Sequence, residues 1–181
     1  MRYVILDRDG TLIRHVPYLH EVRHVELLPT VTQGLAELVE AGCRLFLHTN
    51  QSGIGRGYFS AEEAVACNEA MLHQIGRGSA LFAEVCVSPE IPGQDVGYRK
   101  PSPRWAQELM ARHGIAASNL CYVGDNVSDL LTARNVGCAG VGVGTGVPKL
   151  RERLAQQGLQ YPVFDSFLDA ARHIVGEMSR A

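Results

Sequence analysis

The sequence lacks the features that would direct a chain to a membrane or to nucleic acid. None of its apolar stretches approaches the roughly 20 residues that span a bilayer, and the opening residues, MRYVILD, contain no signal-peptide core. A formal net charge of -2 provides no broad cationic surface for nucleic acid or acidic lipid. We therefore expect a cytoplasmic protein that binds neither nucleic acid nor a membrane, with room only for a small local cationic pocket.

Paired cysteines are also missing. The chain has five cysteines, an odd number, with no Cys-x-x-Cys pair, and most of them lie in apolar runs. Cysteine in such surroundings behaves as a small apolar side chain, so we expect reduced core residues. Repeats, low-complexity tracts and an interdomain linker are absent as well, and an apolar fraction of 46% is ordinary for a globular protein. The sequence predicts one domain that spans residues 1–181.

Short apolar runs alternate with longer segments of helical period. The predicted strands are 3–6, 43–48, 83–88, 120–124 and 138–144. A first helix is expected after Pro29 and as far as Gly42, and a second from Ser60 to Ile75, with Ser60 and Glu63 as its capping box. Further helices are expected over 103–113, 127–136, 148–157 and 165–178. This alternation favours an α/β fold, a doubly wound parallel sheet in three layers. Ligands of such sheets bind beyond the carboxyl ends of the strands.

Polar residues follow four of the predicted strands. They are Asp7 and Asp9, then Thr49, Asn50 and Ser52, then Arg99 and Lys100, then Asp125 and Asp129. Each group by itself is compatible with a helix cap, a turn or a solvated ion pair. The predicted topology sends all of them to the same edge of the sheet, so their combination is more specific than any single group.

Three of these carboxylates, from Asp7, Asp9 and Asp125, would repel one another at that edge unless a hard cation lay among them. A few oxygen ligands with retained water suit Mg²⁺. Lys100 and Thr49 would offer donors to an anion beside the metal. A metal and donors around one position are typical of a phosphoryl-transfer site.

A glycine-rich stretch at 140–146, GVGVGTG, has the composition of a dinucleotide-binding loop. It lacks the full Gly-x-Gly-x-x-Gly setting at the first strand and a helix start with a partner acid. We therefore expect a turn at the end of a strand. The seven histidines show no metal-ligand spacing.

The order Asp-x-Asp-Gly-Thr, Thr-Asn, Arg-Lys-Pro and Gly-Asp-x-x-x-Asp resembles the haloacid dehalogenase (HAD) superfamily of phosphatases, over about residues 3–145. The stretches DRDGTLI, YLHEV, TNQSGIGRGYFS and YRKP are similar to its heptose-bisphosphate and histidinol-phosphate phosphatase branch. Tyr18 followed by LHEV favours the heptose side. The resemblance implies a Rossmann-like HAD fold without a large cap domain, a small-molecule phosphate ester as substrate, and Mg²⁺ as cofactor; we expect a monomer.

The resemblance also implies roles for individual residues. Asp7 is the expected nucleophile and Asp9 the general acid, then base. Mg²⁺ is expected on the Asp7 carboxylate, the Asp9 main-chain carbonyl and Asp125, with Thr49 and Lys100 on the phosphoryl oxygens and Asp129 orienting Lys100 or the neighbours of Asp125. The residues expected to face the substrate are His15, Tyr18, Asn50, Gln51, Ser52, Arg99 and Asn126.

The sequence departs from this branch in the loop before Arg-Lys-Pro. Relatives hold a zinc ion there with a Cys-x-His pair and a later Cys-x-Cys, places that fall here on Ser88, Glu90, Val96 and Tyr98. These side chains cannot replace thiolates and imidazole. We therefore predict no zinc, with the loop held by its prolines and by packing of Tyr98.

The substrate is less specified than the reaction. Asn126 stands where heptose-bisphosphate enzymes often carry lysine, which favours a monophosphorylated sugar or polyol over a bisphosphate. Histidinol phosphate or another polyol or amino-alcohol phosphate is an alternative substrate. From other functional classes, a phosphoacceptor signalling module and a non-catalytic sugar-phosphate binder also use such residues, although receiver modules order their acidic pair and phosphoacceptor differently.

Overall fold

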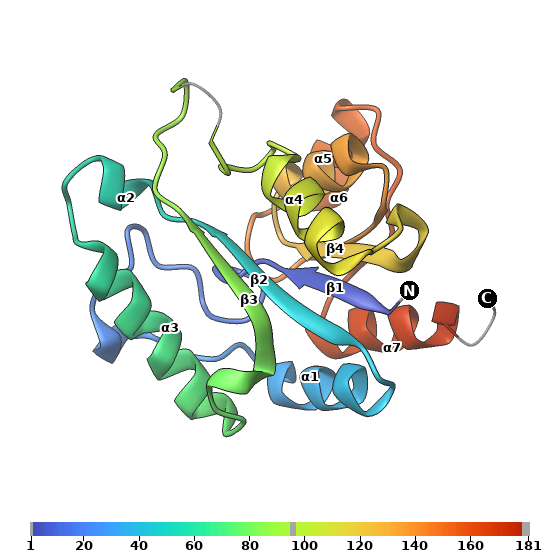
Figure 1. Cartoon of the computed structure of the whole chain (residues 1–181), viewed down its shortest axis with the longest axis horizontal. Coiled ribbons are helices and arrows are strands. Elements are labelled where there is room, and N and C mark those ends of the chain that lie inside the picture. Colours follow the sequence, from blue (N-terminus) through green and yellow to red (C-terminus); the bar gives the residue numbers. More distant parts are fainter. Residues whose placement is uncertain (1, 95–96, 179–181) are drawn as a thin grey trace.

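The computed structural model describes residues 2–94 and 97–178, and its centre is a six-stranded sheet (Figure 1). All strand pairs are parallel, and the order across the sheet is β3-β2-β1-β4-β5-β6. The strands are β1 (Tyr3–Leu6), β2 (Arg44–Asn50), β3 (Phe82–Ser88), β4 (Leu120–Gly124), β5 (Ala139–Val143) and β6 (Val163–Phe164). Because the chain winds outward in opposite directions from β1 and β4, the prediction of a doubly wound parallel sheet is confirmed.

Helices cover both faces of the sheet and make three layers. One face packs against α1 (Val31–Glu40), α3 (Ala61–Ile75) and α7 (Phe167–Met178). The other face packs against α4 (Arg104–His113), α5 (Val127–Val136) and α6 (Leu150–Gln156). Short 3-10 turns lie at Val22–His24, Ser79–Leu81 and Ala117–Asn119, and a one-turn helix, α2 (Ser52–Gly55), follows β2.

The alternation of side chains along β1 connects the two apolar layers. Val4 and Leu6 belong to the cluster on the α1 side, whereas Ile5 packs with Trp105 and Leu109 of α4. Strands buried on both faces appear in sequence as continuous apolar runs, which is how β1 was predicted. The four residues of β1 therefore contribute side chains to the apolar clusters on both faces of the sheet.

Local signals in the sequence account for most element boundaries. The Ser60 hydroxyl accepts a hydrogen bond from the Glu63 N–H, and the Glu63 carboxylate accepts one from the Ser60 N–H, so the predicted capping box at the start of α3 is confirmed. The five cysteines are unpaired, and four of them are buried, as expected. Strand β6 was not predicted, because two residues show no periodicity and are ordered by pairing with β5, Val163 beside Gly142.

The fold places the polar strand ends together. Asp7 follows β1, Thr49 and Asn50 end β2, and Asp125 follows β4, at the same edge of the sheet. Residues 97–103, which precede α4, bring Arg99 and Lys100 to this edge beside Asp7 and Asp125. Among the described residues, no helix is long and apolar enough to cross a membrane.

Candidate active site

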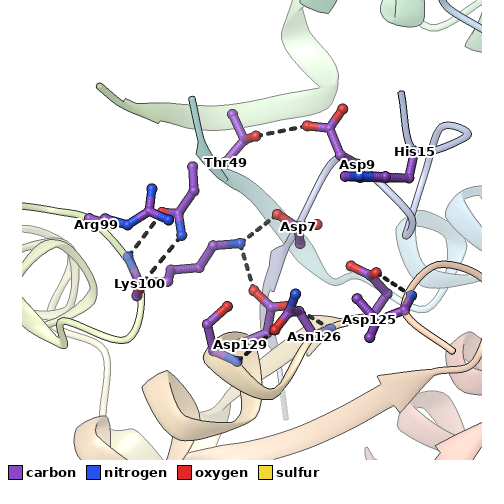
Figure 2. Close-up of a pocket in the computed structure, with 12 residues that line it drawn as sticks. Asp7, Asp9, His15, Thr49, Arg99, Lys100, Asp125, Asn126 and Asp129 are labelled. Atoms are coloured by element: carbon purple, nitrogen blue, oxygen red, sulfur yellow. Dashed lines mark hydrogen bonds and ion pairs between the residues drawn. The ribbon is translucent and has the colours of Figure 1, made fainter. Parts of the chain in front are cut away.

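A cavity of about 350 Å³ opens at the carboxyl ends of β1, β2 and β4 (Figure 2). A neighbouring cavity of about 310 Å³ shares Asp9, His15 and Asn50 with it. The walls of the two cavities include all the site residues expected from the sequence: Asp7, Asp9, His15, Tyr18, Thr49, Asn50, Gln51, Ser52, Arg99, Lys100, Asp125, Asn126 and Asp129. The structure thus brings the expected residues together, while their roles stay predictions.

Lys100 lies between two carboxylates at the bottom of the larger cavity. Its Nζ is 2.5 Å from Asp7 Oδ1 and 2.6 Å from Asp129 Oδ1 (Figure 2). It also donates to the His48 carbonyl at 2.8 Å. The Lys100 side chain is only 2% exposed. Burial alone would lower the pKa of Lys100, but the carboxylates of Asp129 and Asp7 outweigh it, so the pKa is raised. Lys100 is therefore a permanent buried cation beside Asp7.

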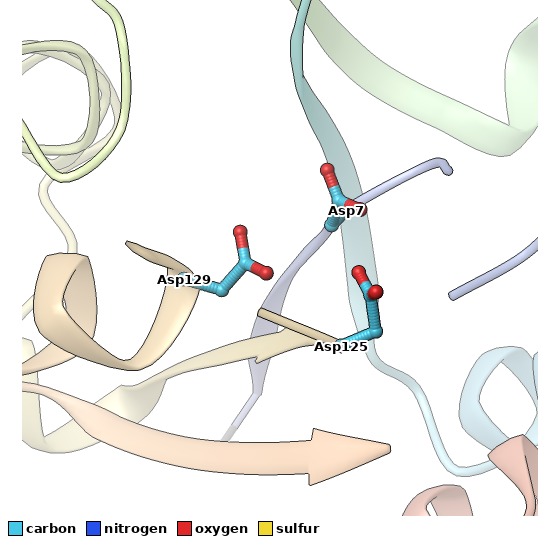
Figure 3. Close-up of side chains that lie close together, drawn as sticks. All are labelled: Asp7, Asp125 and Asp129. Atoms are coloured by element: carbon cyan, nitrogen blue, oxygen red, sulfur yellow. The ribbon is translucent and has the colours of Figure 1, made fainter. Parts of the chain in front are cut away.

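Three aspartates gather around this cation from different elements. Asp7, Asp125 and Asp129 each offer a carboxylate oxygen, and these oxygens lie within 4.8 Å of one another (Figure 3). Burial raises the pKa of Asp7 well above its ordinary range, with Lys100 opposing the rise and Asp129 adding to it. Burial, and then Asp129, raise the pKa of Asp125 to about 7. The cluster carries more negative charge than Lys100 alone neutralises.

This donor set fits a hard divalent cation. Carboxylate oxygens from several elements, close together and short of positive charge, are the ligands that Mg²⁺ prefers. Asp7 and Asp125 belong to the metal set expected from the sequence, and the structure adds Asp129 as a third carboxylate within reach. Both Asp129 oxygens have partners, Lys100 at Oδ1 and the Asn126 N–H at Oδ2, whereas Lys100 contacts Asp7 at Oδ1 and the Val147 N–H contacts Asp125 at Oδ2. Asp7 and Asp125 therefore each keep a second carboxylate oxygen for a metal.

Two glycines allow Asp125 to lie where it does. Gly10 has φ +80°, and a Cβ on it would come within 2.5 Å of Asp125 Oδ2; a Cβ on Gly146 would come within 2.0 Å. The Val147 N–H donates to the same oxygen at 2.9 Å, and the Thr145 hydroxyl donates to the Gly10 carbonyl at 2.6 Å. The glycine-rich stretch 140–146 is thus β5 followed by a turn, as expected, and the turn encloses a carboxylate of the acidic cluster.

Asp9 points away from that cluster. Its Oδ2 accepts a hydrogen bond from the Thr49 hydroxyl at 3.3 Å (Figure 2). The same oxygen accepts from the Gln51 amide at 2.9 Å, and Arg8 contacts both oxygens of Asp9. The Gln51 amide also donates to Thr49 Oγ1 at 2.8 Å. Gln51 was expected to face the substrate, and here its amide is hydrogen-bonded to Asp9 and Thr49 while the residue still lines the smaller cavity.

Arg8 itself was missed in the sequence. It is fully buried, although it lies at the end of an apolar strand between two aspartates. A charged residue two positions after a buried apolar run lies near the interior and needs a partner there, and this was the signal available in DRDG.

The loop that carries Lys100 is anchored by side chains of its own and of β2. The Asn50 side chain donates to the Lys100 carbonyl and accepts from its N–H, at 3.2 and 3.0 Å. The Glu90 carboxylate accepts from the Tyr98 N–H at 2.8 Å and from the Ser88 hydroxyl, and the Glu90 carbonyl accepts from Arg99 Nη1 at 3.1 Å. These contacts position Lys100 and Arg99 at the cavity.

Relatives were expected to carry zinc ligands at four places, and at three of these Glu90 accepts hydrogen bonds from Ser88 and Tyr98. The fourth, Val96, lies outside the described residues. Tyr98 packs against the apolar cluster around Trp105, as predicted. The hydrogen bonds of Glu90 were not predicted, because they depend on how the loop closes.

The N-terminus of α5 faces the larger cavity. Asn126 caps the helix: its side chain accepts from the Ser128 N–H at 3.2 Å, and its own N–H donates to Asp129 Oδ2 at 3.0 Å. Ser128 and Val147 line the cavity and were not predicted. A helix start after a strand in an α/β sheet attracts anions, and this rule was the signal that pointed to Ser128.

Tyr18 and Ser52 belong to the smaller cavity. Tyr18 has φ 53° and is 47% exposed, and its ring meets Tyr58 edge to face with centroids 4.9 Å apart. The residues that line this cavity are less polar than those of the larger cavity, since Val16, Pro17 and Leu19 lie beside Tyr18. The two cavities together have one charged end and one end suited to the body of a substrate.

Comparison with known proteins agrees with this geometry. A family model described as HAD-hydrolase-like matches residues 97–170. The chain is 31% identical over 160 residues to D-glycero-beta-D-manno-heptose-1,7-bisphosphate 7-phosphatase of Bordetella bronchiseptica, covering 88% of each chain. It is also 31% identical over 154 residues to D-glycero-D-manno-heptose-1,7-bisphosphate 7-phosphatase of Thermosynechococcus vestitus, covering 79% of each.

A solved structure extends the likeness to the fold. The crystal structure of D,D-heptose 1,7-bisphosphate phosphatase from B. bronchiseptica, complexed with magnesium and phosphate, superimposes with a TM-score of 0.87 at 29% identity. The match covers 98% of this chain and 99% of that one. That protein therefore binds magnesium and phosphate on the same fold.

Proposed function

Because the chain belongs to the D-glycero-D-manno-heptose-1,7-bisphosphate 7-phosphatase family of HAD-like hydrolases, we propose that it removes the 7-phosphate of a heptose 1,7-bisphosphate in a Mg²⁺-dependent reaction. The observation that carries the proposal is the buried pairing of Lys100 with Asp7 inside the acidic cluster. At the carboxyl edge of the sheet, the Asp7 carboxylate can act as the nucleophile, and the Lys100 ammonium beside it can bind the phosphoryl group.

In the first step, an Asp7 oxygen attacks phosphorus in line with the sugar oxygen. The bond between phosphorus and the sugar oxygen breaks, its electron pair stays on that oxygen, and the Asp9 carboxyl group supplies the proton. The phosphoryl group is now bonded to Asp7. Lys100, already charged and within 2.5 Å of Asp7 Oδ1, pairs with the phosphoryl oxygens as negative charge builds on them.

In the second step, Asp9 takes a proton from water, and the water oxygen attacks phosphorus. The bond between Asp7 and phosphorus breaks, which regenerates the Asp7 carboxylate and releases inorganic phosphate. The side chains of Asp7 and Asp125 and the main-chain carbonyl of Asp9 would hold Mg²⁺, which would supply positive charge to offset the charge of the phosphoryl group. Asp129 keeps Lys100 in place while these bonds change.

The second phosphate of the substrate requires a cation outside the reacting centre. Arg99 lines the larger cavity and is held by the Glu90 carbonyl, so it can meet a distal anion without leaving its loop. The sequence favoured a monophosphate because Asn126 replaces lysine. Family membership favours the bisphosphate instead, and Arg99 supplies the charge that Asn126, a helix cap here, does not.

A phosphate-release assay tests the proposal. The purified protein with Mg²⁺ should turn over D-glycero-D-manno-heptose 1,7-bisphosphate many times, and faster than heptose 7-phosphate or histidinol phosphate. An Asp7→Asn variant serves as the blank. One stable phosphorylation without release would indicate a signalling module, binding without phosphorylation would indicate a sugar-phosphate binder, and a preference for histidinol phosphate would contradict the heptose assignment.

Location in the cytoplasm and a monomeric state stay predictions from the sequence. Size-exclusion chromatography with light scattering measures the second directly. A mass of about twice that of the chain would contradict it.

A further inference from the structure

Arg8 is a charged side chain that neither cavity uses. It is 0% exposed, and it is not among the described residues that line the two cavities. Its guanidinium donates from Nε to Asp9 Oδ2 at 3.0 Å and from Nη2 to Asp9 Oδ1 at 3.2 Å. Nη2 also lies 2.9 Å from Asp9 Oδ2, so both oxygens of the carboxylate contact one planar guanidinium. Contacts of this kind restrict the direction of the carboxylate as well as its place.

The other side of the guanidinium is held by helix α3. Arg8 Nη1 donates to Asn68 Oδ1 at 2.8 Å, and Asn68 is itself buried. The two residues are 60 positions apart in the chain, so this contact exists because α3 packs against the sheet beside β1. Asn68 thereby limits the rotation of Arg8, and Arg8 limits the rotation of the Asp9 side chain.

Gln51 and Thr49 complete the surroundings of Asp9 from β2 and the residue after it. Both donate to Asp9 Oδ2, the oxygen that also accepts from Arg8 Nε. Asp9 is therefore held from two directions, by a cation that comes from behind the site and by neutral donors that line it. Only the cation is out of reach of a substrate in the cavities.

We propose that Arg8 and Asn68 are positioning residues for Asp9, which direct its carboxyl group at the leaving oxygen of the substrate. This inference rests on the proposed function, because it requires Asp9 to protonate a sugar alkoxide. Arg8 and Asn68 then act on the breaking of the bond between phosphorus and the sugar oxygen, and not on substrate binding. Replacing Arg8 or Asn68 should therefore slow phosphoryl transfer more for a leaving group that needs a proton than for one that does not.

Two esters separate this role from a structural one. A sugar alkoxide needs a proton as it leaves, whereas p-nitrophenolate is stable without one. The value of kcat/KM reports phosphoryl transfer to Asp7 and excludes the later hydrolysis, in which Asp9 acts on both esters alike. The readout is therefore the ratio of kcat/KM for heptose 1,7-bisphosphate to kcat/KM for p-nitrophenyl phosphate.

Three variants test the role. Asn68→Leu removes the oxygen that accepts from Arg8 at similar side-chain volume, and Asn68→Asp keeps an acceptor oxygen. Arg8→Lys keeps the positive charge but removes the planar guanidinium. General acid catalysis contributes roughly 10²- to 10⁴-fold, and a misdirected acid loses part of that. Asn68→Leu should therefore lower the ratio about 10-fold, and Arg8→Lys should lower it further. Asn68→Asp should stay near the wild-type ratio. A matched control is Gln74→Leu, which removes the contacts of α3 with Val25 and Leu27 but leaves Arg8 untouched.

The result that overturns the positioning role is an equal loss for both esters in Asn68→Leu, or a lowered ratio in Gln74→Leu. If Arg8→Lys does not fold, the two Asn68 variants decide the matter. If the wild-type protein hydrolyses neither ester, the proposed function and this inference are both wrong. If it hydrolyses both esters, the proposed function stands and the kcat/KM ratios of the variants decide the inference.

Discussion

The site contains two buried cations that are held in different ways. Lys100 contacts Asp7 and Asp129, which come from different elements, and its ammonium group is a compact charge with no fixed direction. Arg8 contacts one carboxylate, Asp9, through a planar fork and is anchored on its far side by Asn68. Lys100 can therefore exchange partners when a phosphoryl group arrives, whereas Arg8 keeps a single geometry.

The difference separates two tasks within one cavity. In the proposed reaction, charge must move around Lys100, because Asp7 gains and loses a phosphoryl group in each turnover. Around Arg8, direction must be kept, because a proton transfer fails when the acid is turned away. The acidic cluster and the Arg8 contacts can be disturbed separately, and the following predictions do so in order of expected effect.

The largest effect is expected for Asp7→Asn. The amide is a poor nucleophile, so turnover should fall by at least about 10⁴-fold. Circular dichroism should show an intact fold, because the amide still accepts from Lys100 and no longer repels Asp125. Activity within about 10-fold of the wild type would contradict the assignment of Asp7 as nucleophile.

Replacement of Lys100 comes next. Lys100→Met removes the charge that meets the developing phosphoryl charge, so kcat should fall about 10²- to 10³-fold. It also leaves Asp7 and Asp129 facing each other in a buried place, so the free energy of unfolding of the metal-free protein should fall by about 3 kcal/mol. Urea denaturation and phosphate release measure the two effects.

The matched variant for this position is Lys100→Arg. The longer planar group keeps the charge but not the compact ammonium that Asp7 and Asp129 share. It should recover much of the stability and little of the activity. Equal recovery of both would show that charge alone, without its geometry, accounts for Lys100.

The pH dependence of stability tests the acidic cluster without a mutation. The folded-state pKa of Asp125 is raised to about 7, and that of Asp7 is also raised, so folded protein binds protons that unfolded protein releases near pH 4. The stability from the Asp125 proton is present below about pH 4 and is lost as pH rises to about 7, at about 1.4 kcal/mol per pH unit. The raised pKa of Asp7 changes stability in the same direction.

Metal-free protein should therefore lose this contribution between about pH 4 and pH 7, and added Mg²⁺ should restore stability at the upper end. Denaturation at a series of pH values, with EDTA or with Mg²⁺, measures the difference. Asp125→Asn is the control and should flatten the dependence. A Mg²⁺ effect of the same size in that variant would remove Asp125 from the metal site.

The smallest effect is expected in the loop before Lys100. Glu90→Gln keeps one acceptor oxygen and a donor, whereas Glu90→Ala removes the acceptor of the Tyr98 N–H, so only the alanine variant should lose about 1 kcal/mol of stability. Activity should change only a few-fold, since Asn50 still holds Lys100. Metal analysis of the same samples should find no stoichiometric zinc, and zinc in the wild type that disappears in Glu90→Ala would overturn this account of the loop.

Much of the site could be predicted because its residues lie at the ends of strands or directly follow them. Asp7, Thr49 and Asp125 need only the strand periodicity and the parallel topology to be placed at one edge. Ser128 and Val147 were missed because Ser128 lines the cavity from the first turn of α5 and Val147 from the turn after β5. Helix starts and turns are weaker sequence signals than strand periodicity. Arg8 had a visible signal, but its partner could not be found by spacing.

By itself, the sequence determined the doubly wound sheet, the edge where the polar residues meet and the chemistry they can perform. These follow from short-range patterns, since strand and helix periods and capping residues are local properties of the chain. The tertiary structure alone decided that Lys100 lies between Asp7 and Asp129, that Gly146 makes room for Asp125, and that Asn68 holds Arg8. Such contacts join residues tens of positions apart, and burial makes them specific, because a buried charge without a partner destabilises the fold.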